Sequence, residues 1–326
     1  MTGIKTTGEK TLMLFSGRAH PELAEEIATA IGIGVSPTDL RDFADGEIYA
    51  RFNESVRGCD AFVVESMTTP VNEWIMETLV MCDALKRGSA KRITVVMPYY
   101  PYARQDKKSR GREPISARLI ADLYKTAGAD RILTVDLHTS QIQGFFDGPV
   151  DHLFALPLLA DHISANYDLS NITVVAPDSG RVRVAERWTE RLGGTPLAFI
   201  HKTRDLNVAN SVVANRVVGE VAGCTCVLVD DMIDTAGTIT KAAEALFNDG
   251  AAAVIVAATH GILSGPAIDR LKNSQISEVV LTNTLPICSD KQFDKLTVLS
   301  IAPLVARAIS EVFADGSVTS LFDGNA

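Results

Sequence analysis

The chain of 326 residues is 46% apolar and 22% charged, and it carries a net charge of −9 at neutral pH. This composition is typical of a soluble globular protein with room for two domains, and the acidic balance argues against a nucleic-acid-binding protein, which shows a basic face. No signal-peptide run, no stretch near the roughly 18 apolar residues of a membrane span and no paired cysteine motif occurs, so we expect no membrane contact and a cytoplasmic location.

Short apolar runs alternate with segments of helical period along the whole chain, which predicts an α/β fold with parallel sheets and crossover helices. The runs are rich in β-branched residues and nearly free of polar ones, as strands covered by helices on both faces require. The expected strands are Leu12–Phe15, Ala61–Glu65, Ile93–Met97, Ile132–Val135, Thr173–Ala176, Ala198–Ile200, Val227–Val229, Val254–Ala257 and Val279–Thr282.

Two amphipathic helices are expected between the strands. Pro21–Ile31 begins with a proline, which suits the first turn of a helix, and carries an apolar stripe. Ser116–Ala127 is expected to bury Leu119, Ile120 and Leu123, and a glycine follows it where a C-terminal cap belongs.

An internal echo predicts two similar domains. Segments 128–138 and 250–260 each lead from a Gly-Ala pair through an apolar strand to a histidine after the strand. We therefore expect an N-terminal domain over 1–155, completed by the tail 311–326, and a C-terminal domain over 156–310.

The most specific motif lies in the second half of the chain. A buried strand is expected to end in Asp230 and Asp231, and residues 234–238 open the helix that follows. Backbone N–H groups at that helix start, with the hydroxyls of Thr235 and Thr238, suit a phosphate group. Because carboxylates repel phosphate, the two aspartates need another partner, such as sugar hydroxyls or a magnesium ion. The alternative is a capped turn with solvated acids.

Polar residues follow other strands as well. Arg104 and Gln105 stand among aromatic residues and prolines, which predicts a rigid, recessed loop rather than a solvated one. His138 and Asp178 each come just after a strand, and α/β sheets bind ligands at the carboxyl ends of their strands. A lone histidine is otherwise more often structural.

Two cations, Lys202 and Arg204, stand one residue apart after a further strand. The polar stretch that follows them could close over a triphosphate, and the alternative is an exposed hairpin with ordinary surface charges. No Gly-x-x-x-x-Gly-Lys-[Ser/Thr] motif occurs, so a Walker-type ATP site is excluded.

The 226–239 string resembles the phosphoribosyl-diphosphate-binding signature of the type I phosphoribosyltransferase family. By that resemblance, Asp230 and Asp231 hold the ribose hydroxyls. The 5-phosphate is held by Asp234, Thr235, Ala236, Gly237 and Thr238. The signature alone does not separate enzymes that make phosphoribosyl diphosphate from those that consume it.

Segments from both halves of the chain are similar to the ribose-phosphate pyrophosphokinase family. They are Phe15-Ser-Gly, Phe43-Ala-Asp45-Gly-Glu47, Glu54-Ser-Val-Arg57-Gly, 98–108, 136–146, 176–180, 200–207, 259–266 and 316–322. The resemblance implies two doubly wound domains of type I phosphoribosyltransferase-like fold. It shows one departure, because the family usually has two glycines after Pro-Asp-x, whereas Gly180 is followed here by Arg181. The departure leaves the backbone near Asp178 open at this point, and it places a cation there.

The resemblance also implies the reaction and its residues. The anomeric oxygen of ribose 5-phosphate would attack the β-phosphorus of ATP, giving phosphoribosyl diphosphate for nucleotide, histidine and tryptophan biosynthesis, with AMP leaving. Such a transfer depends on positioning and charge neutralisation. The implied roles are Mg²⁺ binding by His138 and Asp178, catalysis by Lys202 and Arg204, and ATP binding by Arg104, Gln105 and a neighbouring subunit's Phe43, Asp45 and Glu47. Histidine is an unusual magnesium ligand, so its assignment depends on the resemblance.

Class I members of the family are homohexamers that phosphate activates and ADP inhibits. The matching effector positions are Ser55, Arg57, Ser317 and Thr319, with Arg112 and Asp151 as weaker candidates. For the tail Ser317–Phe322, the alternative is a purely structural terminus.

Two other classes of protein stay open. A phosphoribosyltransferase would need only the second domain and would leave the Arg104 and His138 segments without a role. A non-catalytic, family-like regulatory subunit would be expected to lose the loop cations, yet Lys202 and Arg204 are both present.

Overall fold

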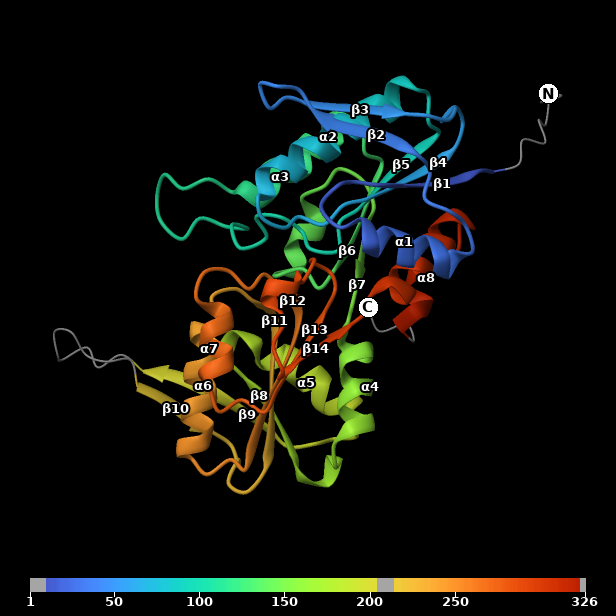
Figure 1. Ribbon diagram of the computed structural model, residues 1–326. Helices are drawn as coiled ribbons and strands as arrows, with labels where there is room; N and C mark the ends of the chain where they lie inside the picture. The colour runs from blue at the N-terminus through green and yellow to red at the C-terminus, as the bar shows by residue number, and fades with distance from the viewer. Residues whose placement is uncertain (1–9, 204–213, 323–326) are drawn as a thin grey trace. The chain divides into compact units, whose positions relative to one another are not determined.

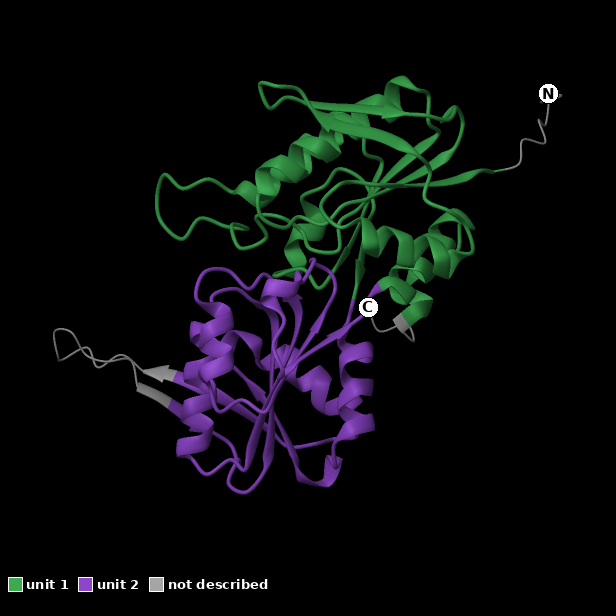
Figure 2. Cartoon of the chain, viewed as in Figure 1, with its two compact units in different colours: residues 1–153, 302–326 green, residues 154–301 purple. Residues whose placement is uncertain are grey.

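A computed structural model describes residues 10–203 and 214–322. The chain forms two compact units, one of Met1–Leu153 with Ala302–Ala326 and the other of Phe154–Ile301 (Figure 2). Unit 1 takes up the chain again at Ala302 rather than at the expected 311, because the whole of helix α8 (Ala302–Phe313) packs against α1 (Pro21–Ile31).

Unit 1 contains a five-stranded parallel sheet in the order β1-β4-β5-β6-β7. Its strands are β1 (Leu12–Ser16), β4 (Asp60–Val64), β5 (Arg92–Val96), β6 (Arg131–Val135) and β7 (Val150–Leu153). Helix α2 (Val71–Arg87) packs against α3 (Ser116–Ala127), while α1 packs against α8 (Figure 1). An antiparallel hairpin of β2 (Thr38–Asp42) and β3 (Ile48–Phe52) stands apart from this sheet, and the unit also has the short helices η1 (Ser140–Gly144) and η5 (Val318–Phe322).

Unit 2 contains a seven-stranded sheet in the order β10-β9-β8-β11-β12-β13-β14. Among the described strands of this sheet, only β10 is antiparallel to its neighbour, which is β9. The strands are β8 (Ile172–Ala176), β9 (Leu197–Thr203), β10 (Ala214–Val218), β11 (Thr225–Ile233), β12 (Ala253–Gly261), β13 (Glu278–Thr282) and β14 (Leu296–Leu299).

Helices cover both faces of the unit 2 sheet (Figure 1). On one face α4 (Leu156–Asn166) packs against α5 (Val182–Arg191), and on the other α6 (Gly237–Asn248) packs against α7 (Ala267–Asn273). The short helices are η2 (Leu169–Asn171), η3 (Ser179–Arg181) and η4 (Ser289–Lys291). The chain runs from β8 outward to β9 and then returns to the other side of β8 for β11. Such a reversal leaves a crevice at the carboxyl ends of the two strands, where α/β sheets bind ligands.

The α/β class and the parallel sheets are confirmed, and each predicted strand overlaps an observed one. The main error concerns strand length. β11 runs on to Ile233 and β12 to Gly261, because the two strands stay paired in parallel along nearly their whole length. Asp230 and Asp231 therefore lie within β11 rather than at its end, and His260 lies within β12 rather than after it. The predicted echo is thus only partial, since His138 does follow its strand.

The expected buried stripe of α3 is wrong. Leu119 and Leu123 are 56% and 39% exposed, whereas Ala117, Ala121 and Tyr124 are buried together with Ile120. The buried side of α3 thus carries two alanines beside Ile120 and Tyr124, and the two leucines lie on the exposed side.

Candidate active site

Two neighbouring aspartates define the site in unit 2. Asp230 and Asp231 lie on β11, beside the carboxyl end of β8, and their side chains are 16% and 8% exposed. Arg181 reaches both carboxylates from the segment after β8. Its Nε lies 3.2 Å from Asp230 Oδ1, and its Nη2 donates to Asp231 Oδ1 at 2.5 Å. One guanidinium thus bridges the two acids at the switch point of the sheet.

Burial and mutual repulsion dominate the electrostatics of this pair. Burial raises the pKa of Asp230 well above its usual range, and the adjacent charge of Asp231 raises it further. Arg181 lowers the pKa of Asp230, as does the backbone N–H of Asp231, which donates to Asp230 Oδ1 at 2.9 Å. The cation therefore favours the ionised form against the two larger effects.

A tight turn joins β11 to α6 and forms the candidate phosphate loop. Ala236 occupies the left-handed region with φ 59°, and α6 begins directly after it at Gly237. The first N–H groups of a helix lack partners within the helix, and the helix dipole makes this end positive. Thr235 and Thr238 are exposed at this turn. The turn therefore presents hydroxyl and N–H donors that suit an anion.

Two residues that the sequence interpretation did not assign support this loop. Arg270 of α7 donates from Nη1 to the carbonyl of Thr235 at 2.9 Å, and Ser264 donates its hydroxyl to Asp234. The backbone N–H of Ser264 also donates to the carbonyl of Asp234 at 3.0 Å. Ser264 belongs to a segment already matched to the family, but a lone arginine on a helix gives no sequence signal.

Asp178 caps the short helix that follows β8. Its Oδ1 accepts from the N–H of Gly180 at 2.9 Å, and its carbonyl accepts from the N–H of Arg181. Asp178 and Arg181 thus belong to one tight segment beside β11. Arg181 follows Gly180 without disturbing that capping bond.

The predicted catalytic cations are only partly covered by the structure. Lys202 lies within β9, opposite Asn215 of β10, and not in a loop after the strand as expected. β9 is longer than its apolar residues predicted because it pairs with β10 through Thr203. Arg204 lies outside the described residues.

In unit 1, the 98–108 loop is anchored by its aromatic and acidic residues. Tyr100 is buried, and its hydroxyl donates to the carbonyl of Ala117 at 2.8 Å. Arg104 and Gln105 themselves are exposed, so the expectation of a recessed loop is wrong for these two side chains. Gln105 is nevertheless held, since its Oε1 accepts from the Ser116 hydroxyl at 2.6 Å.

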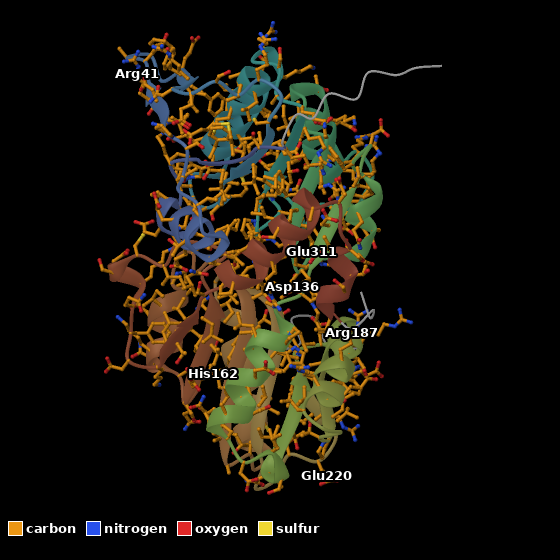
Figure 3. The ribbon with its side chains drawn as sticks, turned by 90° about the vertical axis from the view of Figure 1, so that its right-hand side faces the viewer. Arg41, Asp136, His162, Arg187, Glu220 and Glu311 are labelled. Atoms are coloured by element: carbon orange, nitrogen blue, oxygen red, sulfur yellow. The ribbon has the colours of Figure 1, made fainter. Side chains whose placement is uncertain are left out.

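A buried carboxylate joins this loop to the segment after β6. Asp106 is 7% exposed and accepts from Thr139 Oγ1 at 3.0 Å and from the side-chain amide of Gln141. His138 immediately precedes Thr139, and Asp136 takes φ 40° just past the end of β6 (Figure 3). The Arg104 and His138 segments are therefore neighbours within unit 1, a link that the sequence did not reveal.

The three residues Phe43, Asp45 and Glu47 lie at the tip of the β2–β3 hairpin. The tip is closed by two backbone hydrogen bonds, one from the N–H of Phe43 to the carbonyl of Glu47 and one from the N–H of Gly46 to the carbonyl of Phe43. The side chain of Asp45 accepts from the N–H of Glu47 at 3.1 Å. Phe43 is 50% exposed and contacts Tyr49 edge-on, with the ring centroids 5.8 Å apart. The hairpin thus presents an aromatic ring and two carboxylates to the surroundings of unit 1.

The predicted effector positions lie on two segments of unit 1. Ser55 and Arg57 are exposed after β3, while the hydroxyls of Ser317 and Thr319 are 2.7 Å apart in the tail. Of the weaker candidates, Asp151 pairs with Arg131 at 2.6 Å, and Arg112 is exposed with φ 70°.

The structure and the comparisons agree on the class. A parallel α/β unit with an acidic pair and a helix start at its switch point has the arrangement in which α/β enzymes bind phosphorylated ligands. Residues 12–128 match the N-terminal domain of ribose phosphate pyrophosphokinase, and residues 206–323 match the phosphoribosyl synthetase-associated domain.

The relatives are similar over nearly the whole chain. Ribose-phosphate pyrophosphokinases of Streptomyces coelicolor and Mycobacterium tuberculosis are 70% and 68% identical, covering 99% and 98% of this chain and the same shares of their own. The crystal structure of phosphoribosylpyrophosphate synthetase from Mycobacterium smegmatis is 63% identical, with a TM-score of 0.90, over 94% of this chain and 100% of that one. This chain belongs to the ribose-phosphate pyrophosphokinase family, and it is a transferase of nucleotide biosynthesis.

Proposed function

We propose that this enzyme moves the diphosphate of ATP onto the anomeric hydroxyl of ribose 5-phosphate, with Asp230, Asp231 and the 234–238 turn as the sugar-phosphate site. The observation that carries the assignment is the placement of two buried carboxylates next to the start of α6, at the switch point of the unit 2 sheet. Carboxylates accept hydrogen bonds from the ribose hydroxyls, and the turn donates to the phosphate at the other end of the sugar. A single substrate that carries both groups satisfies both parts of the site.

The residues of the 234–238 turn have different roles in binding the phosphate. Thr235 and Thr238 supply hydroxyl donors, and Gly237 and Ala236 shape the turn. Asp234 accepts a hydrogen bond from the Ser264 hydroxyl, which holds the turn in place. Arg270 restrains the same turn through the carbonyl of Thr235.

Magnesium binding is part of the proposal, with Asp178 and His138 as its protein ligands. Within the two described stretches of chain, no group of three or more His, Cys, Asp and Glu side chains could hold a metal ion. Mg²⁺ keeps several waters and is commonly held by one or two protein groups together with substrate phosphates. Asp178 is a hard oxygen donor of the suitable kind. When bound, the ion would neutralise charge on the phosphates.

The remaining roles concern ATP. Lys202 and Arg204 would stabilise charge on the transferred diphosphate and on the leaving oxygen, because cations placed where charge develops lower the barrier. Arg104 and Gln105 would engage the nucleotide, and the exposed tip with Phe43, Asp45 and Glu47 would serve the adenine site of a neighbouring subunit. The chain would then act as a homo-oligomer, a hexamer in the family's pattern.

Regulation by phosphate and ADP is proposed at Ser55, Arg57, Ser317 and Thr319, because hydroxyls and a guanidinium bind phosphate groups well. Arg57→Ala should blunt phosphate activation and relieve the ADP inhibition that ATP does not compete away. Turnover at saturating substrate should stay largely intact. Unchanged phosphate and ADP responses in that variant would remove the site.

A cytoplasmic location completes the proposal. Among the helices that the structure describes, none is both long enough and apolar enough to cross a membrane.

The decisive experiment is a product assay with the pure protein. Incubation with ATP, magnesium and ribose 5-phosphate should yield AMP and phosphoribosyl diphosphate in equal amounts. Consumption of phosphoribosyl diphosphate with a free base, without any need for ATP, would instead identify a phosphoribosyltransferase. Normal binding of both substrates without AMP formation would identify a regulatory subunit.

A further inference from the structure

Arg181 is the cation that contacts both aspartates of the proposed sugar site. Asp230 and Asp231 are adjacent in sequence, and both side chains are largely buried on β11. Two carboxylates at such a distance repel each other, and burial strengthens the repulsion because little water screens it. A ligand that brings a phosphate dianion to the neighbouring turn would add a third negative group.

The guanidinium of Arg181 offsets the repulsion between the two carboxylates because it contacts both of them. Arg181 is itself only 16% exposed and places one nitrogen on each acid, with Nε on Asp230 and Nη2 on Asp231. Both contacts go to Oδ1 atoms, so each carboxylate presents its second oxygen in a direction that the guanidinium fixes. The planar fork of an arginine is suited to hold two acceptors in this way, and a lysine ammonium supplies the charge without the fork.

The local backbone holds the arginine in place. Asp178 caps the N–H of Gly180, and the carbonyl of Asp178 accepts from the N–H of Arg181 at the start of α5. The β8 strand that leads into this segment is paired in register with β11, Val175 opposite Leu228. The guanidinium is therefore attached to the adjacent strand, and its reach to the acids does not depend on a long loop.

We infer that Arg181 is a positioning residue for ribose 5-phosphate, which supplies the positive charge that lets both aspartates accept the ribose hydroxyls without a divalent cation between them. The inference depends on the proposed assignment of Asp230 and Asp231 to the sugar. It adds to that assignment a specific expectation, namely that ribose 5-phosphate can bind to the enzyme without a metal ion.

The test measures binding of ribose 5-phosphate by calorimetry in the presence of EDTA and without ATP, so no turnover contributes. Arg181→Gln should weaken binding about tenfold or more, as expected for lost hydrogen bonds to charged groups. Arg181→Lys should recover a large part of the loss. Magnesium added at millimolar concentration should bring the ribose 5-phosphate affinity of Arg181→Gln closer to that of the parent enzyme. The affinity of the parent enzyme should hardly change.

The matched control is Arg183→Gln, which removes the same charge two positions further along an exposed face of α5 and should bind like the parent enzyme. Thermal unfolding of every variant separates loss of binding from loss of folding, and Arg181→Lys keeps the test available if Arg181→Gln does not fold. Parent-like binding by Arg181→Gln in EDTA would overturn the inference, and so would a loss that lysine does not repair at all. If the parent enzyme and Asp231→Asn both fail to distinguish ribose 5-phosphate from inorganic phosphate, the sugar assignment itself is wrong.

Discussion

The two units are built from the same kind of parallel sheet but differ in how the chain passes through it. In unit 1 the sheet strands follow one another in sequence order from β1 to β7, so the sheet has no point at which the chain reverses direction across it. In unit 2 the chain goes outward from β8 and comes back beside it, and the acidic pair, Arg181 and the α6 turn all lie where that reversal occurs.

This difference explains why each unit makes its polar site in a different manner. Unit 2 uses regular elements, since two aspartates lie inside a strand and the donors lie at the start of a helix. Unit 1 uses loops joined by side chains, with Asp106 linking the 98–108 loop to the segment after β6. Residues at the far end of the unit 2 sheet, such as Glu220 near the amino end of β11, have no part in either arrangement (Figure 3).

The largest effect is expected from the cations of unit 2. Lys202→Ala and Arg204→Ala should each lower kcat on the order of 10²-fold or more, because each removes a positive charge that stabilises the negative charge of the transition state. The KM for ribose 5-phosphate should change little. Steady-state kinetics with both substrates varied will check this, with the exposed Lys241→Ala on α6 as the control. Near-normal kcat with a much raised KM for ribose 5-phosphate would move these residues into the sugar site.

The second prediction separates the two units by ligand. Thr235→Ala and Thr238→Ala should each weaken ribose 5-phosphate binding by about 1–3 kcal/mol, the range for hydrogen bonds to charged groups. ATP binding without the sugar should hardly change. Calorimetry with each ligand alone is the measurement. The control is Thr189→Ala, which removes a hydroxyl that donates to the carbonyl of Glu186 within α5. Loss of ATP binding with the sugar phosphate retained would reverse the assignment of the two sites.

The third prediction concerns the loop-built site of unit 1. Asp106→Ala removes the buried acceptor that joins Thr139 and Gln141 to the 98–108 loop. We expect a rise in the KM for ATP of roughly three- to tenfold, as for the loss of about 1 kcal/mol of hydrogen bonding, with ribose 5-phosphate binding unchanged. Asp83→Asn, which alters an exposed pair on α2, is the control. An equal effect on both substrates would mean that the link serves stability alone.

The smallest effect is expected from an exposed ion pair in the tail of unit 1. Contacts with Lys10 and Arg92 lower the pKa of Asp315 from 3.8 to about 2. Because the folded state favours the ionised carboxyl, its contribution is complete above pH 3.8 and is lost as the pH falls toward about 2. Asp315→Asn should therefore slightly lower the melting temperature at neutral pH, and the difference from the parent should shrink in acid. The control is Asp294→Asn, at an exposed position of unit 2. A difference in melting temperature between Asp315→Asn and the parent that does not depend on pH would contradict the pairing.

The apolar pattern of the sequence predicted the sheets well but not the ends of their strands. β11 was predicted to end at Asp230 and Asp231, yet pairing with β12 carries the strand on to Ile233. The β2–β3 hairpin was not predicted, since its residues alternate too weakly between polar and apolar. In α3, the packing partner decided which side is buried, and the sequence offers no view of that partner.

The site was predictable where a motif specifies the backbone and unpredictable where contacts come from distant segments. The aspartate pair and the 234–238 turn were identified from one continuous string, and the structure brings them together. Arg270 and Asp106 were not assigned, because their partners lie 35 and 33 to 35 positions away in the chain. Arg181 was noted as a departure from the family, but its contacts with both aspartates depend on how β8 and β11 pair in the fold.

Helix α8 has a consequence for how the protein is made. It belongs to unit 1, packs against α1 and buries seven of its residues, among them Val305 and Ile309, yet it follows the whole of unit 2 in the chain. A ribosome synthesises the chain from α1 toward α8, so every residue of unit 2 is made before unit 1 can close its apolar surface on α1. Unit 2, which is one continuous segment, can complete its sheet during synthesis, while unit 1 must wait with α1 uncovered. In truncated chains that end at Ile301, limited proteolysis should therefore find unit 2 resistant to cleavage and unit 1 sensitive to it.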